Sequence, residues 1–465
     1  MGEMTLSQVL VTLALLTAAF GVGGSLAFPW REPKQTSFFS GIVNALMRSS
    51  TDFQSIASTA DLCRLAGYMV EEHHVETEDG YILTLHHIPP YANPMRSSSP
   101  ESDNSPPETP KRDEGSARSA ENGGKETAKE GGHAHAFPGA GNVVFLQHGL
   151  MGSSDNWNTN TEEDSLAYLL SNAGYDVWMG NFRGNIYSRG HASMTHNDPD
   201  FWRFSYDEMA RYDLPSMLDY VANQTSAEKL HYIGHSMGTT VFFALMSSRP
   251  EYQSRIRSMV ALAPVATVRS ITSPIKYLAP IVSELHFMLR LFGNDEELMT
   301  NRLLTSLWDP YRVCSNQAIC ENLQFMITGF DPDRADQKMV PVILSHNPAG
   351  ASTQTLFHFV QGFNSGRFQQ YDWGKKGNML KYGTEQPPEY DVSKIDLPVT
   401  LFWAGNDWLT GKEDISRLEK QLPQLQASYK VSNPVFSHLD FLWANDVHSL
   451  VYDKLFEVLN NEVRT

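Results

Sequence analysis

The chain has 465 residues, 41% of them hydrophobic, which is enough for one large domain or two ordinary ones with a sizeable core. Its 36 basic and 53 acidic residues give a net charge of -17 at pH 7. This charge argues against nucleic acid as a partner and against a basic surface that binds membranes.

The amino-terminal sequence predicts a signal peptide. An apolar stretch from Val9 to Phe20 is followed by small residues, and the triplet SLA at 25–27 fits the small-x-small cleavage pattern. We expect residues 1–27 to be removed, so that the mature chain begins at Phe28. An uncleaved anchor is the alternative, because Val9 to Phe28 has about the 20 residues that cross a bilayer. The glycines near the end of this stretch favour cleavage.

The stretch HHVETEDGYILTLHHIP, at 73–89, predicts the first strands. Its two halves are joined by Glu78-Asp79-Gly80, which is a hairpin signal. We assign residues 28–90 to an amino-terminal segment that contains this hairpin.

An insert of low complexity follows at residues 91–140. No large apolar residue occurs between Met95 and Phe137. Such a segment cannot bury enough apolar surface to offset the entropy of ordering it, so we expect it to be disordered.

From residue 141 onwards, short apolar runs alternate with helical segments, the first of which are 162–174 and 212–224. The predicted strands lie at 142–149, 175–184, 229–234, 256–266, 397–407 and 427–433. Continuous apolar strands separated by helices predict an α/β fold with a mostly parallel sheet and helices on both faces. Residues 267–395 interrupt the alternation and are expected to form a mostly helical cap. The core then consists of residues 141–266 and 396–465.

The sequence YIGHSMGTT, at 232–240, is typical of a nucleophile elbow. Ser236 lies between Gly234 and Gly238, after an apolar strand and before a predicted helix. The glycines leave room where a strained turn brings backbone segments close together. The alternative is an ordinary serine at a strand-helix junction. Whether suitable catalytic partners follow in the sequence decides between the two interpretations.

Two candidate partners follow other predicted strands. Asp407 closes the strand at 397–407, and His438 lies just past the last strand. Chemistry gathers at the carboxyl ends of the strands in an open parallel sheet. Each residue alone fits a turn or surface position, but the order Ser236, Asp407, His438 is that of the α/β-hydrolase triad. We expect these three residues to catalyse acyl transfer.

An acyl-transfer site also needs backbone N–H donors for the oxyanion. Met237, the residue after the nucleophile, is expected to supply one. Leu150, in the QHGL loop after the strand at 142–149, is expected to supply the other.

The chain resembles the acid lipase family, which includes gastric lipase, lysosomal acid lipase and their insect relatives. The matching stretches, in order, are TEDGYILTLHHIP, VFLQHGLMGSSDNW, SLAYLLSNAGYDVWMGNFRGNIYSR, FWRFSYDEMARYDLP, YIGHSMGTT, SHNPAGASTQTLFHFVQ, FQQYDWG, GNDWLT and HLDFLW. The resemblance implies the α/β-hydrolase fold with an inserted cap or lid. It also implies triad roles for Ser236, Asp407 and His438 and oxyanion roles for Leu150 and Met237.

The chain departs from the family in three places. Met237 stands where the family usually has glutamine, and the insert at 91–140 is longer than the loop expected there. Cys314 and Cys320 are closer together than the disulfide pair of the family.

The cysteines and the sequon bear on the compartment. In a secreted chain, Cys314 and Cys320 can form a disulfide across the sequence CSNQAIC, and Cys63 is then unpaired. Three buried thiols are the alternative. Asn223, in the sequence NQT, is a candidate glycosylation site.

These observations predict a serine lipase, secreted or in the lysosomal lumen, that hydrolyses triacylglycerols or related neutral lipids at the lipid-water interface. A sterol ester hydrolase of the same family and a non-catalytic lipid carrier are the alternatives. The mechanism implies no metal or cofactor, and we infer no stable protein partner.

The apolar stretch 273–293 is expected either to pack permanently on the core or to act as a lid that opens at lipid.

Overall fold

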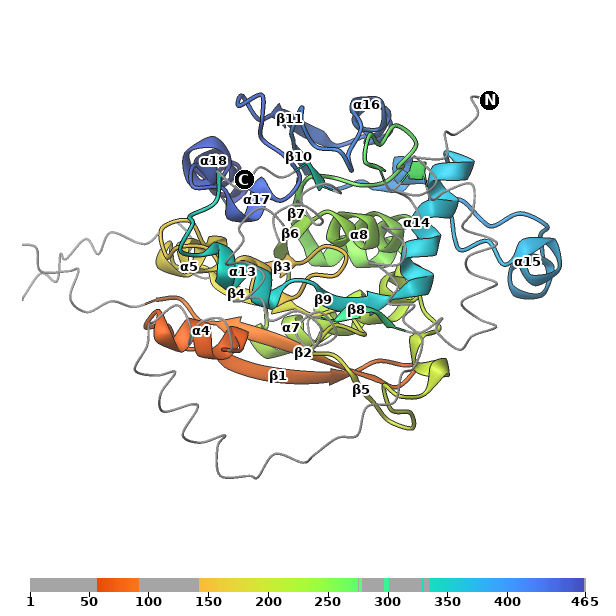
Figure 1. Ribbon diagram of the computed structural model, residues 1–465, viewed down its shortest axis with the longest axis horizontal. Helices are drawn as coiled ribbons and strands as arrows, with labels where there is room; N and C mark the ends of the chain where they lie inside the picture. The colour runs from red at the N-terminus through yellow and green to blue at the C-terminus, as the bar shows by residue number, and fades with distance from the viewer. Residues whose placement is uncertain are drawn as a thin grey trace, which may run out of the picture.

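The computed structural model describes residues 57–91, 142–274, 276–277, 297–300, 328–329 and 334–463 (Figure 1). The signal peptide at 1–27, nearly all of the insert at 91–140, Cys314 and Cys320 lie outside the described residues. So does most of the proposed lid at 273–293. Among the helices described, none is long and apolar enough to cross a membrane.

The fold is built on a nine-stranded sheet in which eight strands follow the order β1-β2-β4-β3-β6-β7-β10-β11 and β5 pairs with β2. Its strands are β1 (Glu71–Glu76), β2 (Tyr81–Ile88), β3 (Val143–Gln147), β4 (Asp176–Gly180), β5 (Gly190–His191), β6 (Leu230–His235), β7 (Ile256–Leu262), β10 (Val399–Trp403) and β11 (Leu425–Lys430). The strands from β4 to β11 are parallel, whereas β2 is antiparallel to both β1 and β4. The hairpin β1–β2 lies at one edge and β11 at the other (Figure 1).

Helices cover both faces of the sheet. They are α4 (Thr59–Leu65), α5 (Leu166–Asn172), α6 (Tyr206–Glu208), α7 (Leu214–Thr225), α8 (Met237–Ser248), α13 (Val340–His346), α14 (Thr353–Ser365), α15 (Gly374–Tyr382), α16 (Lys412–Gln421), α17 (Asp440–Trp443) and α18 (Asp453–Val463). Side chains alternate along each strand, so Phe145 packs with α7 and α8 on one face, whereas Val144 and Leu146 pack with α5 and α18 on the other. The predicted α/β architecture with a mostly parallel sheet is confirmed.

A buried ion network ties the β1–β2 hairpin to the sheet. The Arg183 guanidinium, whose side chain is 1% exposed, donates to Asp79 in the hairpin turn and to Asp213 before α7. It also lies 3.9 Å from the centre of the Tyr81 ring. Because the guanidinium contacts both carboxylates, the positive charge of Arg183 and the negative charge of Asp213 are buried as a pair.

Some short elements were not predicted from the sequence. The strands β8 (Glu297–Thr300) and β9 (Ala349–Ser352) form a separate two-stranded antiparallel sheet. The sequence AGAS of β9 consists of small residues without apolar alternation, so its pattern carries no strand signal. Between β7 and β10 in the chain, the described residues include the helices α13, α14 and α15.

Candidate active site

Ser236 lies in the sharp turn between β6 and α8. Its backbone has φ 53° and ψ -120°, a region that residues other than glycine rarely adopt. Strain of this kind costs on the order of 1–3 kcal/mol and persists only where the surrounding structure holds it. Here the Ser236 N–H donates to the carbonyl of Leu262 on β7 at 3.0 Å, and the Thr239 N–H donates to the Ser236 carbonyl at 2.8 Å. The turn presents Ser236 at the carboxyl end of the central strand.

The glycines around Ser236 allow three chain segments to meet. A Cβ atom on Gly238 would lie 2.4 Å from the carbonyl oxygen of Gln147 at the end of β3, and one on Gly234 would lie 3.0 Å from the Gly238 carbonyl carbon. A Cβ atom on Gly149 would lie 3.0 Å from the Cβ atom of Ser236. The elbow, α8 and the loop after β3 therefore pack at distances that no larger residue allows.

The structure brings the three predicted triad residues together. The Nε2 atom of His438 lies 2.8 Å from the Oγ atom of Ser236, and its Nδ1 atom lies 2.8 Å from Oδ2 of Asp407. The Asp407 carboxylate only accepts hydrogen bonds when ionised, so Nδ1 of His438 carries the proton and Nε2 is free to accept one from Ser236.

Asp407 is buried and its second oxygen is also satisfied. Oδ1 accepts hydrogen bonds from the backbone N–H groups of Leu409 at 2.8 Å and Thr410 at 3.0 Å. These bonds fix the carboxylate in one orientation. Asp407 follows β10, and the loop after it supplies both donors.

Two neighbouring residues, His235 and Asp440, hold the loop that carries His438. The buried His235 donates from Nε2 to the backbone carbonyl of His438 at 2.9 Å. Burial, with the neighbouring His438, lowers the pKa of His235 to about 3, so this ring is neutral. On the other side, Asp440 accepts from the Ser437 N–H at 2.7 Å and pairs with Arg334 at 3.2 Å.

Leu150 and Met237 are the residues expected from the sequence to supply backbone donors near Ser236. Met237 is the first residue of α8, where the helix dipole favours negative charge. Leu150 follows Gly149, which lies against Ser236. Within the described residues, neither N–H group makes a hydrogen bond. In the part of the chain that the structure describes, neither donor is therefore taken up by a protein acceptor.

The Gly149–Leu150 peptide is held by His148. The Nδ1 atom of His148 lies 2.7 Å from the Gly149 carbonyl oxygen, and its Nε2 atom accepts the Phe182 N–H at 3.1 Å and lies 3.2 Å from Nδ2 of Asn185. These partners require a proton on Nδ1 and none on Nε2. Burial lowers the pKa of His148 to about 4, which keeps this neutral tautomer. Since C=O and N–H point in opposite directions across a trans peptide, holding the carbonyl also aims the Leu150 N–H.

Sequence reasoning missed the supporting histidines. His235 directly precedes Ser236 and His148 lies two positions before Leu150, but a single histidine beside a glycine or serine has no distinctive pattern. Their roles depend on contacts across strands, and only the folded structure shows these.

Asn223 and Cys63 are two further positions from the sequence analysis that the structure describes. Asn223 is exposed in the last turn of α7, where the hydroxyl of Thr225 donates to the carbonyl of Val221. Cys63 is a buried free thiol that accepts from Nδ2 of Asn158 at 3.3 Å, and burial raises its pKa to about 12. Such a thiol is protonated and inert.

The arrangement has the parts needed for acyl transfer. It offers a hydroxyl, an imidazole whose Nε2 atom lies 2.8 Å from that hydroxyl, and a carboxylate that orients the imidazole. All of these parts lie at the carboxyl ends of parallel strands.

Comparison with known proteins agrees with this geometry. The family profile described as the alpha/beta hydrolase fold matches residues 142–444, and that described as a partial alpha/beta-hydrolase lipase region matches residues 59–161. The chain is 38% identical over 397 residues to gastric triacylglycerol lipase of Mus musculus, covering 84% of this chain and 89% of the relative. It is 35% identical over 415 residues to lysosomal acid lipase/cholesteryl ester hydrolase of Homo sapiens, covering 88% and 92%. The chain therefore belongs to the α/β-hydrolase lipase family of the gastric and lysosomal acid lipases and is a carboxylic ester hydrolase.

Proposed function

We propose that the chain hydrolyses neutral lipid esters through a covalent acyl-enzyme on Ser236. The observation that carries the proposal is the continuous contact from Asp407 through His438 to Ser236, with 2.8 Å at each step. A structural serine has no need of a histidine and a buried carboxylate in line behind it.

In the first half of the reaction, His438 takes the Ser236 proton as Oγ attacks the ester carbonyl. The N–H groups of Leu150 and Met237 stabilise the oxyanion, a contribution worth about 10²- to 10³-fold in rate for a single donor. His438 then gives the proton to the departing alcohol, which leaves the acyl group on Ser236.

In the second half, His438 deprotonates a water molecule, which attacks the acyl-enzyme. The tetrahedral oxyanion forms again beside Leu150 and Met237, and its collapse releases the fatty acid. Ser236 recovers its proton from His438. Asp407 stays ionised throughout and holds the imidazole in the required tautomer.

The substrate class proposed is a triacylglycerol or a related neutral lipid. The names of the relatives support it, since one is a triacylglycerol lipase and another is named as both an acid lipase and a cholesteryl ester hydrolase. The second name favours a sterol ester as the alternative substrate. We further propose that the enzyme works at the lipid-water interface, as a lipase with an inserted cap would.

The compartment proposed is the extracellular space or the lysosomal lumen, reached through cleavage after Ala27. The same proposal includes the bridge between Cys314 and Cys320 and a glycan on Asn223. Sequencing of the mature amino terminus tests the cleavage. Mapping of unreduced peptides and treatment with a glycosidase test the bridge and the glycan.

Hydrolysis by the purified protein tests the substrate. Triolein, a cholesteryl ester and a short soluble ester are compared from about pH 4 to about pH 8, with Ser236→Ala as the blank. Triolein turnover that rises sharply once the substrate forms droplets supports the proposal. A rate confined to the short dissolved ester contradicts it, and a cholesteryl ester rate above that of triolein favours the alternative.

A further inference from the structure

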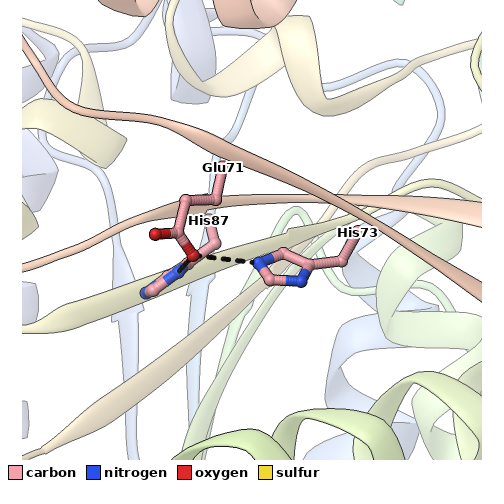
Figure 2. A group of neighbouring side chains, drawn as sticks. All are labelled: Glu71, His73 and His87. Atoms are coloured by element: carbon pink, nitrogen blue, oxygen red, sulfur yellow. Dashed lines mark hydrogen bonds and ion pairs between the residues drawn. The ribbon is translucent and has the colours of Figure 1, made fainter.

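A cluster of metal-binding side chains lies on the β1–β2 hairpin, outside the proposed active site. Glu71 and His73 are two positions apart on β1, so both side chains lie on one face of the strand. His87 on β2 is the register partner of Glu71 across the antiparallel pair. The Glu71 carboxylate lies between the two imidazole rings (Figure 2).

The distances in the cluster suit a small divalent cation. Oε2 of Glu71 lies 3.3 Å from Nε2 of His73 and 3.3 Å from Nδ1 of His87. Tetrahedral ligands at about 2.0 to 2.1 Å from Zn²⁺ are about 3.3 to 3.4 Å apart. The three ligand atoms lie within 4.8 Å of one another, so a small rotation of the rings closes the remaining edge.

The outer nitrogen of each ring has a hydrogen-bond partner. Nε2 of His87 contacts the Asp176 carboxylate, which accepts its proton, and Nδ1 of the same ring faces Glu71. Nδ1 of His73 lies 3.1 Å from the hydroxyl of Tyr220, and its Nε2 atom is buried without a hydrogen bond. A carboxylate behind a ligand histidine, as Asp176 lies behind His87, is a common outer-sphere arrangement of zinc sites.

Packing against Trp178 limits the two rings to small rotations. His87 stacks on Trp178 with 4.1 Å between ring centres, and His73 lies 4.8 Å from the same indole. The side chains of His73 and His87 are 18% and 13% exposed, whereas that of Glu71 is 55% exposed. A cation can therefore enter past Glu71 and meet two oriented nitrogen ligands.

We propose that Glu71, His73 and His87 form a zinc site. Two histidines and one glutamate are a ligand set that Zn²⁺ accepts, with water in the fourth position. Asp176 and Tyr220 hold the two rings as outer-sphere partners.

The site stabilises the fold and takes no part in ester hydrolysis. Asp176 begins β4 and Gly180 ends it, so the zinc site lies near the amino end of that strand, whereas Ser236 lies at the carboxyl ends. The ion joins the edge strand β1 to β2 and, through Asp176 and Tyr220, to β4 and α7. Because only the folded chain assembles these ligands, zinc binding favours the folded state by mass action.

The test is calorimetric titration of the metal-free protein with Zn²⁺. His133 and His135, which form an HAH sequence in the insert, are first replaced by asparagine so that they bind no metal. We expect one Zn²⁺ per chain and a melting temperature that rises with zinc. Ester hydrolysis is unchanged by zinc at concentrations that saturate the site.

Single variants separate the cluster from other histidines. Tyr220→Phe loses only an outer-sphere partner and should weaken zinc binding by about 10- to 100-fold. A variant that removes a ligand should weaken zinc binding more than this; the three are Glu71→Gln, His73→Asn and His87→Asn. His74→Asn is the matched control, because His74 is the next residue on β1 but pairs with Glu72 and Thr84 on the opposite face. This control should bind zinc like the parent.

Folding of the variants is checked by their melting temperature without zinc. Glu71 is exposed, so Glu71→Gln is the variant least able to disturb the fold. Co²⁺ bound in place of zinc gives a second measurement, because its visible absorption spectrum reports whether the site is tetrahedral. The proposal is overturned if the parent shows no saturable zinc binding. It is also overturned if Glu71→Gln and His87→Asn bind zinc as tightly as the parent does.

Discussion

Nε2 of His438 lies 2.8 Å from Oγ of Ser236, although 202 positions separate the two residues in the chain. The parallel sheet produces this contact, because β6 and β10 both run toward the edge where Ser236 and Asp407 lie. Asp407 and His235 then fix the ring and the backbone of His438. The position of a single imidazole thus depends on three separate parts of the sequence.

Loss of a triad residue should abolish hydrolysis without unfolding the protein. We expect Ser236→Ala or His438→Ala to lower kcat by about 10⁶-fold and Asp407→Asn by about 10⁴-fold, since these residues act as a unit. The double variant Ser236→Ala/His438→Ala should be no worse than either single variant. Initial rates on a dissolved ester measure this, and additive losses in the double variant contradict a shared mechanism.

We propose that His148 positions the backbone N–H of Leu150, the expected oxyanion donor. His148→Leu removes the hydrogen bond to the Gly149 carbonyl and should lower kcat by on the order of 10²-fold with little change in KM. His148→Asn keeps a donor near the same position and should recover part of the rate. A loss that appears only in KM, or no recovery with asparagine, argues against this role.

Arg183 should be among the most costly residues to replace for stability. Arg183→Met leaves Asp213, whose side chain is 0% exposed, buried without its cation. Breaking a buried pair in this way costs about 3–5 kcal/mol in the free energy of unfolding. Arg203→Met is the matched control, because Arg203 is 65% exposed and pairs with an exposed Asp200, so its loss should cost less than about 1 kcal/mol. Urea unfolding of both variants compares them, and similar midpoints contradict the prediction.

Buried histidines should make the fold less stable as the pH falls below about 6.5. Burial lowers the pKa of His148 and His231 to about 4 and that of His235 and His358 to about 3, against 6.5 in the unfolded chain. The unfolded chain therefore binds more protons in this range, so the stability present above pH 6.5 is lost on acidification. Each proton changes the free energy of unfolding by about 1.4 kcal/mol per pH unit.

Two buried carboxyls act in the opposite direction. Burial raises the pKa of Asp207 and Asp440 to about 6, so between pH 6 and their ordinary value of 3.8 the folded chain binds the extra protons. Their contribution is present at acid pH and lost as the pH rises through 6. With four histidines against two carboxyls, the unfolding free energy should still fall from pH 6.5 to about pH 4.5. His231→Gln should make the decline shallower, and a stability that rises over this range contradicts the balance.

The sequence predicted the strands and the triad because both have local patterns. The apolar runs that became β3, β6 and β10 differ from their predicted limits by a few residues, and Ser236 has a glycine on each side at fixed spacing. Asp407 and His438 were placed by their position after strands. The zinc cluster has no such pattern, since Glu71, His73 and His87 come together only through the hairpin register. The same holds for His148, whose partners Phe182 and Asn185 lie beyond the next strand.

Covalent trapping by a fluorophosphonate tests the central claim most directly, that His438 activates Ser236 as the nucleophile. Mass spectrometry of the treated protein should show one adduct per chain, on the peptide that contains Ser236, together with complete loss of hydrolysis. Ser236→Ala should form no adduct, and His438→Ala should react far more slowly. A folded Ser236→Ala protein that still forms the adduct and hydrolyses esters would contradict the account.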